Sequence, residues 1–248
     1  MACAYEVADW REYRMDWHDP HRILEPAARE IELAEGALSC LVDAGILPTA
    51  SYDHGRFDAY REAVRRSFEI PWTAISPRLQ RVMYAINAII RPRVMVAVGI
   101  FCGNTFVCNA GAAIGPGSVY QAEHLVGLEI RLAEAERARR NVATLDPHGA
   151  RVEIVGEDGI PWLRNYCGSI DLLYLDADGP QGRGKSIYLD LLEAGLHALH
   201  PGALVLAHNS VNSAHQLADY LAFVRNPQVF RESANLILDD QGLEVSLL

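Results

Sequence analysis

A glycine turn and two acidic residues follow three successive predicted strands. The first strand ends in a turn that runs from Gly99 to Gly103 and opens a helix rich in small residues. Glycines here let the backbone approach a ligand closely and bend into a helix N-terminus. Glu129 ends the second strand, where an acid can accept hydrogen bonds from both hydroxyls of a ribose. Asp158 follows the third strand, where it could accept a hydrogen bond from an adenine amine.

The spacing of these residues narrows the ligand class. The turn has the pattern G-x-x-x-G, which differs from the G-x-G-x-x-G of dinucleotide enzymes. The order of turn, ribose acid and third-strand acid therefore predicts an adenosine-bearing ligand without a pyrophosphate. Two structural alternatives stay open: the glycines could serve an ordinary βα turn, and Glu129 could cap the helix that begins near Arg131.

Strands and helices alternate from residue 93 onward, which favours an α/β fold with a Rossmann-like, doubly wound, mostly parallel sheet. Val94–Val98 is a continuous apolar run, typical of a strand covered on both faces. Further strands are expected at residues 125–130, 152–155, 171–176 and 203–207, with helices at 131–145 and 188–199. Residues 234–238 and 243–248 predict two strands joined by a turn, so the sheet is expected to end in an antiparallel hairpin at one edge.

The first 90 residues differ in pattern, because they predict helices and little strand. Apolar residues recur at helical spacing over residues 21–44, and residues 53–68 predict a second, more polar helix. Ser76 and Pro77 are typical of a third helix N-terminus, which Pro92 would stop. We therefore expect an N-terminal helical cap or lid over residues 1–75 and a ligand-binding domain over residues 76–248.

Four stretches resemble, in the right order, motifs of the class I S-adenosylmethionine (SAM) dependent methyltransferases. They are residues 76–80 with 98–105, residues 127–130 with 138–141, residues 171–178 and residues 199–209. The catechol and caffeoyl-CoA O-methyltransferase branch is the most similar one. The resemblance implies SAM as cofactor, bound at Gly99, Phe101, Gly103, Asn104, Thr105, Glu129, Ile130, Asp158, Gly159 and Asp176.

That family usually holds a divalent cation with an Asp after the fourth strand and an Asp-Asn pair after the fifth. Asp176 and Asn209 match this pattern, but His208 stands where the pair has its Asp. Mg²⁺ and Ca²⁺ prefer oxygen ligands, and a softer ion would find only one charged ligand here. We therefore expect no obligatory metal and assign no metal ligands.

The general base of the family is also replaced. The family places a lysine about three residues after the fourth-strand Asp, where this chain has Gly179. Lys185 lies in the glycine-rich loop beyond it, where we expect a solvated side chain. His208 is then the predicted base, since an ordinary histidine titrates near pH 6.5, with Asp176 and Asn209 as its catalytic partners. A structural histidine at a strand end is the alternative.

Two further features concern the ligand. Ala97 stands where relatives commonly carry an acid near the methionine amine. Several aromatic residues lie between positions 10 and 18, and a sulfonium cation favours aromatic faces. Most of them are expected to pack the N-terminal helices onto the core, with one or two lining the site. Tyr13, Trp17 and Tyr188 are the predicted lid and substrate contacts.

Composition restricts the partners. Lys plus Arg total 22 against 32 Asp plus Glu, a net charge of −10 that disfavours nucleic acid. No apolar run is long enough to cross a membrane, and no signal peptide is evident. Five scattered cysteines without a CxxC indicate free thiols in a reducing compartment. We expect a cytoplasmic protein of secondary metabolism that acts on a small molecule or on SAM alone. We expect no membrane partner, and a homodimer is an open alternative to a monomer.

Three functions are compatible with these residues. The first is methyl transfer from SAM to an oxygen or nitrogen of a small molecule. The second, motivated by Ala97 and His208, is cyclisation of SAM, in which the methionine amine attacks its own side-chain carbon. That reaction gives azetidine-2-carboxylate and methylthioadenosine. The third is a non-catalytic SAM-binding module.

Overall fold

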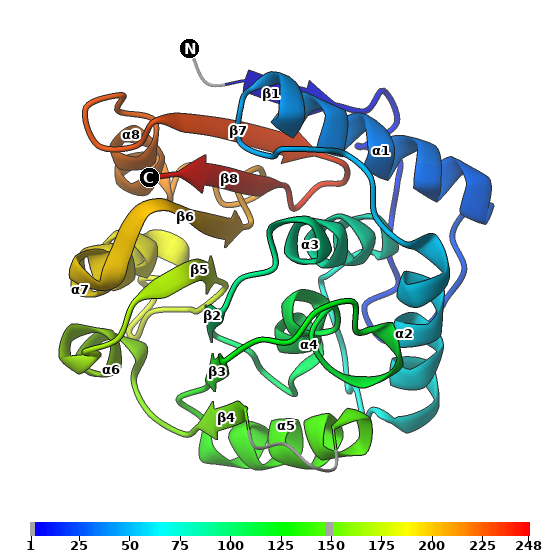
Figure 1. Ribbon diagram of the computed structural model, residues 1–248, viewed down its shortest axis with the longest axis horizontal. Coiled ribbons are helices and arrows are strands. Elements are labelled where there is room, and N and C mark those ends of the chain that lie inside the picture. The colour runs from blue at the N-terminus through cyan, green and yellow to red at the C-terminus, as the bar shows by residue number, and fades with distance from the viewer. Residues whose placement is uncertain (1–2, 147–150) are drawn as a thin grey trace.

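The computed structural model describes residues 3–146 and 151–248, which form one mixed sheet between two layers of helices (Figure 1). The strands are β1 (Cys3–Glu6), β2 (Val94–Val98), β3 (His124–Leu128), β4 (Val152–Val155), β5 (Ile170–Leu175), β6 (Leu199–His208), β7 (Glu232–Ile237) and β8 (Leu243–Leu247). Their order in the sheet is β1-β7-β8-β6-β5-β2-β3-β4. Only β8 runs antiparallel to its neighbours, so the predicted mostly parallel sheet with a C-terminal hairpin is confirmed.

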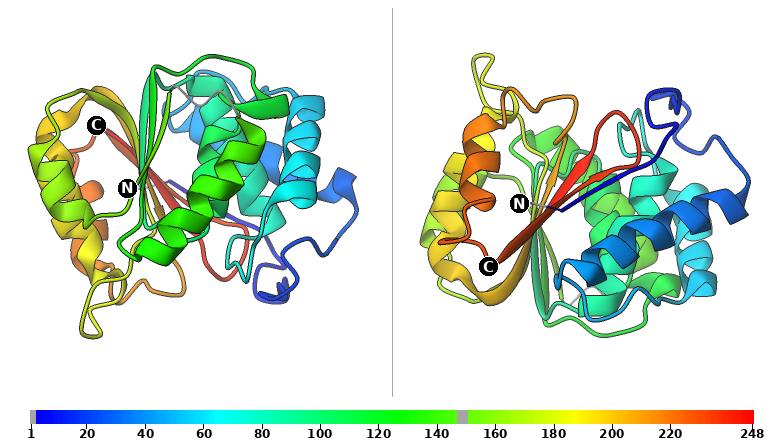
Figure 2. Two further views of the ribbon diagram at one scale, coloured as in Figure 1. Left: turned by 90° about the horizontal axis from the view of Figure 1, so that it is seen from below. Right: turned by 90° about the horizontal axis from the view of Figure 1, so that it is seen from above.

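Helices cover both faces of the sheet, as Figure 2 shows from two directions. They are α1 (Ala27–Asp43), α2 (His54–Ser67), α3 (Pro77–Ile90), α4 (Asn104–Ala110), α5 (Leu132–Leu145), α6 (Gly159–Asn165), α7 (Tyr188–Gly195) and α8 (Ala218–Val224). The first five lie on one face and the last three on the other. Along β2, Met95 and Ala97 join the core on the first side, whereas Val96 and Val98 join the core on the second. This division explains the uninterrupted apolar run of β2.

Helix α3 begins where the sequence indicates. The Ser76 hydroxyl accepts a hydrogen bond from the backbone nitrogen of Leu79 at 3.2 Å, and Pro77 occupies the first helical position. Ten of its residues are buried, because α3 packs against α1 and α4 on one face of the sheet. Among the described residues, no helix is both long and apolar enough to cross a membrane.

The expectation of little strand before residue 90 misses the N-terminal strand. Cys3–Glu6 forms β1, which pairs in parallel with β7 and places Cys3 opposite Ala234. The hairpin of β7 and β8 is therefore not the edge of the sheet, because β1 covers it. A four-residue strand is too short for a clear periodic pattern, and its partner lies more than two hundred residues away in sequence. The boundary between residues 75 and 76 stays a prediction.

Candidate active site at the carboxyl ends of the strands

A cavity of about 730 Å³ opens at the carboxyl ends of the central strands. Val98 and Leu128 line it where β2 and β3 end, and Asp176 and His208 line it at the ends of β5 and β6. Parallel strands present their carboxyl ends at one edge of a sheet, so residues that follow different strands converge there. The volume is typical of sites for small molecules and cofactors.

The glycine turn forms one wall of this cavity. Gly99 has φ 83°, and a Cβ there would lie 2.5 Å from the backbone of Ala177, so only glycine fits where the two chain segments cross. Gly103, also with positive φ, does not line the cavity but precedes α4. Its conformation sets the direction of α4 and so places Asn104 and Thr105 at the wall.

Glu129 joins the glycine turn to the start of α5. One carboxylate oxygen accepts a hydrogen bond from the backbone nitrogen of Phe101 at 2.8 Å. The other accepts from the backbone nitrogen and Nε of Arg131, at 3.1 and 2.9 Å. A carboxylate has about four acceptor sites, so capacity for ribose hydroxyls remains. The structural and the ligand-binding interpretations of Glu129 are therefore compatible.

Asp158, Gly159 and Ile130 also line the cavity, as expected. Asp158 caps α6 by accepting a hydrogen bond from the backbone nitrogen of Ile160 at 2.9 Å. A Cβ on Gly159 would lie 2.6 Å from the Val98 side chain, so glycine is needed for α6 to approach β2. Ile130 is largely exposed, which leaves an apolar surface free beside Glu129.

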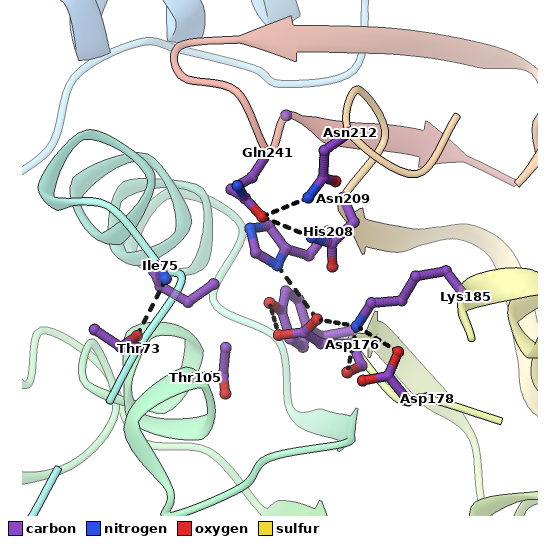
Figure 3. A network of polar contacts seen from close by, with 12 residues as sticks. Thr73, Ile75, Thr105, Asp176, Asp178, Lys185, His208, Asn209, Asn212 and Gln241 are labelled. Carbon is purple, nitrogen blue, oxygen red and sulfur yellow. Dashed lines mark hydrogen bonds and ion pairs between the residues drawn. The ribbon is translucent and has the colours of Figure 1, made fainter. Parts of the chain in front are cut away.

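Asp176 is the centre of a polar network at the wall of the cavity (Figure 3). Its Oδ1 accepts a hydrogen bond from Lys185 Nζ at 2.9 Å and lies 3.2 Å from His208 Nδ1. Its Oδ2 accepts a hydrogen bond from the hydroxyl of Tyr174 at 3.3 Å. Burial alone would raise the pKa of Asp176, but the electrostatic attraction and hydrogen bonds of Lys185 and His208 outweigh it and lower that pKa to about 2. The carboxylate is therefore ionised at neutral pH.

His208 is held with one ring nitrogen free. An ionised carboxylate can only accept, so Nδ1 must donate to Asp176. In the neutral ring Nε2 then carries the lone pair, and it has no hydrogen-bond partner among the described residues. The side chain is only 1% exposed. An oriented imidazole with a free Nε2 at a cavity wall is the arrangement that a general base requires.

Asn209 completes the set that the sequence predicted to be catalytic. Its backbone has φ 67°, and its Nδ2 donates to Oε1 of Gln241 at 2.9 Å. Asn212 donates to the same oxygen at 2.8 Å (Figure 3). The Oδ1 of Asn209 has no partner among the described residues. The structure thus brings Asp176, His208 and Asn209 to one wall, with two free acceptor atoms.

Lys185 is not the solvated loop residue that the sequence suggested. Its side chain is only 12% exposed and contacts Asp176 directly. Its backbone nitrogen donates to Gln216 Oε1 at 2.8 Å, which anchors the end of the loop at the cavity. Burial alone would lower the pKa of Lys185, but Asp176 and Asp178 raise it above its usual value. A lysine that keeps its proton so firmly is a poor general base.

Of the three predicted lid residues, only Trp17 reaches the cavity. It stacks on Trp72 with ring centroids 6.3 Å apart, and Trp72 lies 4.8 Å from the ring of Phe101. Tyr13 lies elsewhere, since its ring is buried beneath the Arg78 guanidinium at 3.7 Å. Tyr188 is fully buried behind the wall, 5.7 Å from Lys185 Nζ.

Several lining residues lie outside the sequence prediction. The loop before α3 contributes Trp72, Thr73 and Ile75, and the segment after β6 contributes Gln216. The Thr73 hydroxyl accepts hydrogen bonds from Asn104 Nδ2 at 3.0 Å and from the Ile75 backbone nitrogen at 3.1 Å. The predicted N-terminus of α3 was the available signal for this loop, because its N-cap Ser76 directly follows Ile75.

The donor set around Asp176 does not fit a divalent cation. One carboxylate oxygen of Asp176 already accepts from the Lys185 ammonium and contacts the His208 imidazole, and the neighbouring carboxylate of Asp178 pairs with the same ammonium. Hard cations need several oxygen ligands. Within residues 3–146 and 151–248, no group of three or more His, Cys, Asp or Glu side chains forms a candidate metal site. Metal independence of the reaction stays a prediction.

No protein-family model matches the sequence, and no curated protein is a significant match. Solved structures do match. A SAH-bound methyltransferase from Podospora anserina is 13% identical over 92% of this chain and 99% of its own, with a TM-score of 0.60. The O-methyltransferase TomG from Streptomyces achromogenes, in complex with SAM, is 18% identical over 80% and 91%, with a TM-score of 0.57. An O-methyltransferase from Bacillus cereus in complex with SAH is 16% identical over 88% and 100%, with a TM-score of 0.55. The chain therefore has the class I methyltransferase fold that the four motifs predicted.

Proposed function

We propose that the cavity binds SAM and that the protein transfers its methyl group to a small molecule. The observation that carries this proposal is that the two ends of the cavity offer different chemical groups. At one end the glycine turn and Glu129 offer a site for a ribose, and at the other end His208 Nε2 is a free acceptor. The SAM and SAH complexes among proteins of this fold support the same ligand.

In this reaction a hydroxyl or amine of the acceptor attacks the sulfonium methyl carbon. The new carbon–oxygen or carbon–nitrogen bond forms as the carbon–sulfur bond breaks, and SAH leaves. His208 Nε2 takes the acceptor's proton, and Asp176 stabilises the imidazolium that results. The residues of this wall thus orient the acceptor and remove its proton, while in-line positioning supplies much of the remaining acceleration.

Cyclisation of SAM is the second candidate, and strand β2 supplies the observation that favours it. Ala97 is fully buried in the apolar core, and β2 carries no carboxylate to hold the methionine amine as an ammonium. A neutral amine can attack the γ-carbon of its own chain, which breaks the bond from that carbon to sulfur. The products are azetidine-2-carboxylate and methylthioadenosine, and His208 takes the proton from nitrogen.

One incubation separates the candidates. Purified protein with SAM alone, and then with a panel of small phenols and amines, is analysed by mass spectrometry. SAH that appears only with an acceptor supports transfer, whereas methylthioadenosine without an acceptor supports cyclisation. SAM binding without either product would favour the non-catalytic binding module. His208→Ala is the matched control, since it should still bind SAM.

We further propose a cytoplasmic location, a role in secondary metabolism and small-molecule or SAM-only chemistry. The scattered free cysteines support a cytoplasmic location. The net charge of −10 argues against nucleic acid as a partner. A homodimer stays an alternative to a monomer, and light scattering at several protein concentrations distinguishes the two. A single mass at the monomer value throughout would exclude the homodimer.

A further inference from the structure

Lys185 is the only lysine in the sequence; the other basic side chains that contribute to the total of 22 are arginines. This one ammonium lies at the polar wall of the cavity, with three oxygens around it. Asp176 Oδ1 is 2.9 Å away, the backbone oxygen of Asp176 is 3.1 Å away, and Asp178 Oδ1 is 3.6 Å away. An ammonium has three protons to donate, and each of them here has an oxygen to face.

Specific contacts of the loop before Lys185 fix the position of this residue at the cavity. Gly179 and Gly184 form an antiparallel bridge, in which the Gly179 nitrogen donates to the Gly184 oxygen at 2.8 Å. Gly184 has φ 50°, and a Cβ on it would lie 2.4 Å from Gln216 Oε1. That same oxygen accepts the hydrogen bond from the Lys185 backbone. The position of the ammonium therefore results from several specific contacts rather than from a flexible side chain.

We propose that the ε-ammonium of Lys185 is the resident cation of this site and acts as a positioning residue. It neutralises Asp176 and fixes its carboxylate, so that the same oxygen can orient His208. It also occupies the space among the oxygens of Asp176 and Asp178 where a divalent ion would otherwise bind. The proposal rests on the proposed function only in assuming that His208 reacts with a substrate.

The variant without this ammonium should differ from the original protein in what its cavity can bind. Lys185→Ala leaves an oxygen-lined space beside an ionised carboxylate, with the free Oδ1 of Asn209 at the same wall. Carboxylate and carbonyl oxygens suit Mg²⁺, Ca²⁺ and Mn²⁺. Removal of one built-in cation should therefore create affinity for another.

Manganese binding is the first test, measured by the loss of the free Mn²⁺ electron paramagnetic resonance signal. We expect Lys185→Ala to bind Mn²⁺ about tenfold or more tightly than the original protein, with a weak dissociation constant typical of few oxygen ligands. Lys185→Ala combined with Asp176→Asn should lose this gain, and Lys185→Arg should not show it. Equal Mn²⁺ binding by the original protein and Lys185→Ala, with both folded by circular dichroism, would overturn the proposal.

The second test needs no destabilising variant, because labelling with nitrogen-15 lysine marks a single side chain. An ammonium held by oxygens exchanges its protons slowly and should give one NMR signal at neutral pH, whereas a solvated lysine gives none. The absence of that signal would contradict the proposal even if Lys185→Ala fails to fold. Neither measurement requires SAM or turnover, so a failure of the proposed function would be seen separately.

Discussion

Two buried charge clusters of this protein can be compared, one among the N-terminal helices and one at the cavity. In the first, Glu30 on α1 is paired through both oxygens, with Arg81 at 2.5 Å and with Arg61 at 2.8 and 2.9 Å. In the second, Asp176 is paired with Lys185 and His208, yet His208 Nε2 is left without a partner. Both clusters are buried and charged, but only the second contains an unpaired ring nitrogen on a residue that lines the large cavity.

The difference shows how to separate structural from chemical ion pairs. A smaller cavity of about 240 Å³ also borders Glu30 and Arg61, so neither burial nor a nearby cavity identifies an active site. A carboxylate paired only with arginines of neighbouring helices holds elements together, here α1, α2 and α3. A carboxylate that orients an imidazole with a free nitrogen can support a proton transfer.

Arg81→Met should give the largest effect and should act on stability alone. It leaves Glu30 with one partner fewer in a buried position, and breaking such a pair costs about 3–5 kcal/mol. Urea unfolding measures the free energy, and calorimetry should show unchanged SAM affinity. Arg29→Met is the matched control, since its pair with Glu32 is exposed and worth less than about 1 kcal/mol. A loss of SAM binding in folded Arg81→Met would mean that the N-terminal cluster serves the site.

His208→Ala should act mainly on turnover, in contrast to Arg81→Met, which acts on stability. Removal of a general base lowers turnover about 10²-fold or more, while SAM affinity changes little. Steady-state rates and calorimetry on the same preparation separate the two effects. Full activity in this variant would make His208 a structural residue and would remove the contrast between the clusters.

Acid should weaken the second cluster in a defined direction. The pKa of Asp176 is lowered to about 2 in the folded protein, so its stabilising contribution is present above the unfolded pKa of about 4. The contribution is lost as the pH falls through the folded value, on the order of 2 kcal/mol in total. Urea unfolding from pH 5 to pH 2 should show the original protein losing more stability than Asp176→Asn. Parallel curves would indicate that Asp176 is not preferentially ionised in the folded state.

Glu129→Ala should reduce SAM affinity by at least about 1.5 kcal/mol, because charge-assisted hydrogen bonds to the ribose are lost. Isothermal calorimetry measures the change. Glu153→Ala removes an exposed acid of β4 that pairs with His124, and it should leave the affinity unchanged. Unaltered binding in Glu129→Ala would place the ribose elsewhere.

Chelation should have the smallest effect. Since Lys185 supplies the positive charge beside Asp176, turnover in excess EDTA should equal that without it. A rate that falls with EDTA and returns with Mg²⁺ would show that a metal takes part.

Local chemistry in the sequence was sufficient for most elements and for one side of the site. The Ser76 cap, the apolar run of β2 and the acids after successive strands depend on neighbours close in the chain or on the geometry common to parallel sheets. For that reason the glycine turn, Glu129 and the set of Asp176, His208 and Asn209 could be predicted to converge, as they do.

The remaining features were decided by contacts between distant segments. Strand β1 exists because β7 offers it a partner, and no pattern in four residues shows that. Lys185 reaches Asp176 because a glycine bridge and Gln216 direct the loop inward, whereas its sequence alone is typical of a solvated turn. Tyr13 and Tyr188 became core residues because neighbouring side chains enclosed their rings. The spacing of apolar residues and the helix caps act over three or four residues, so they determine where helices and strands form. Only tertiary packing decides which side chains are buried in the core and which line the cavity.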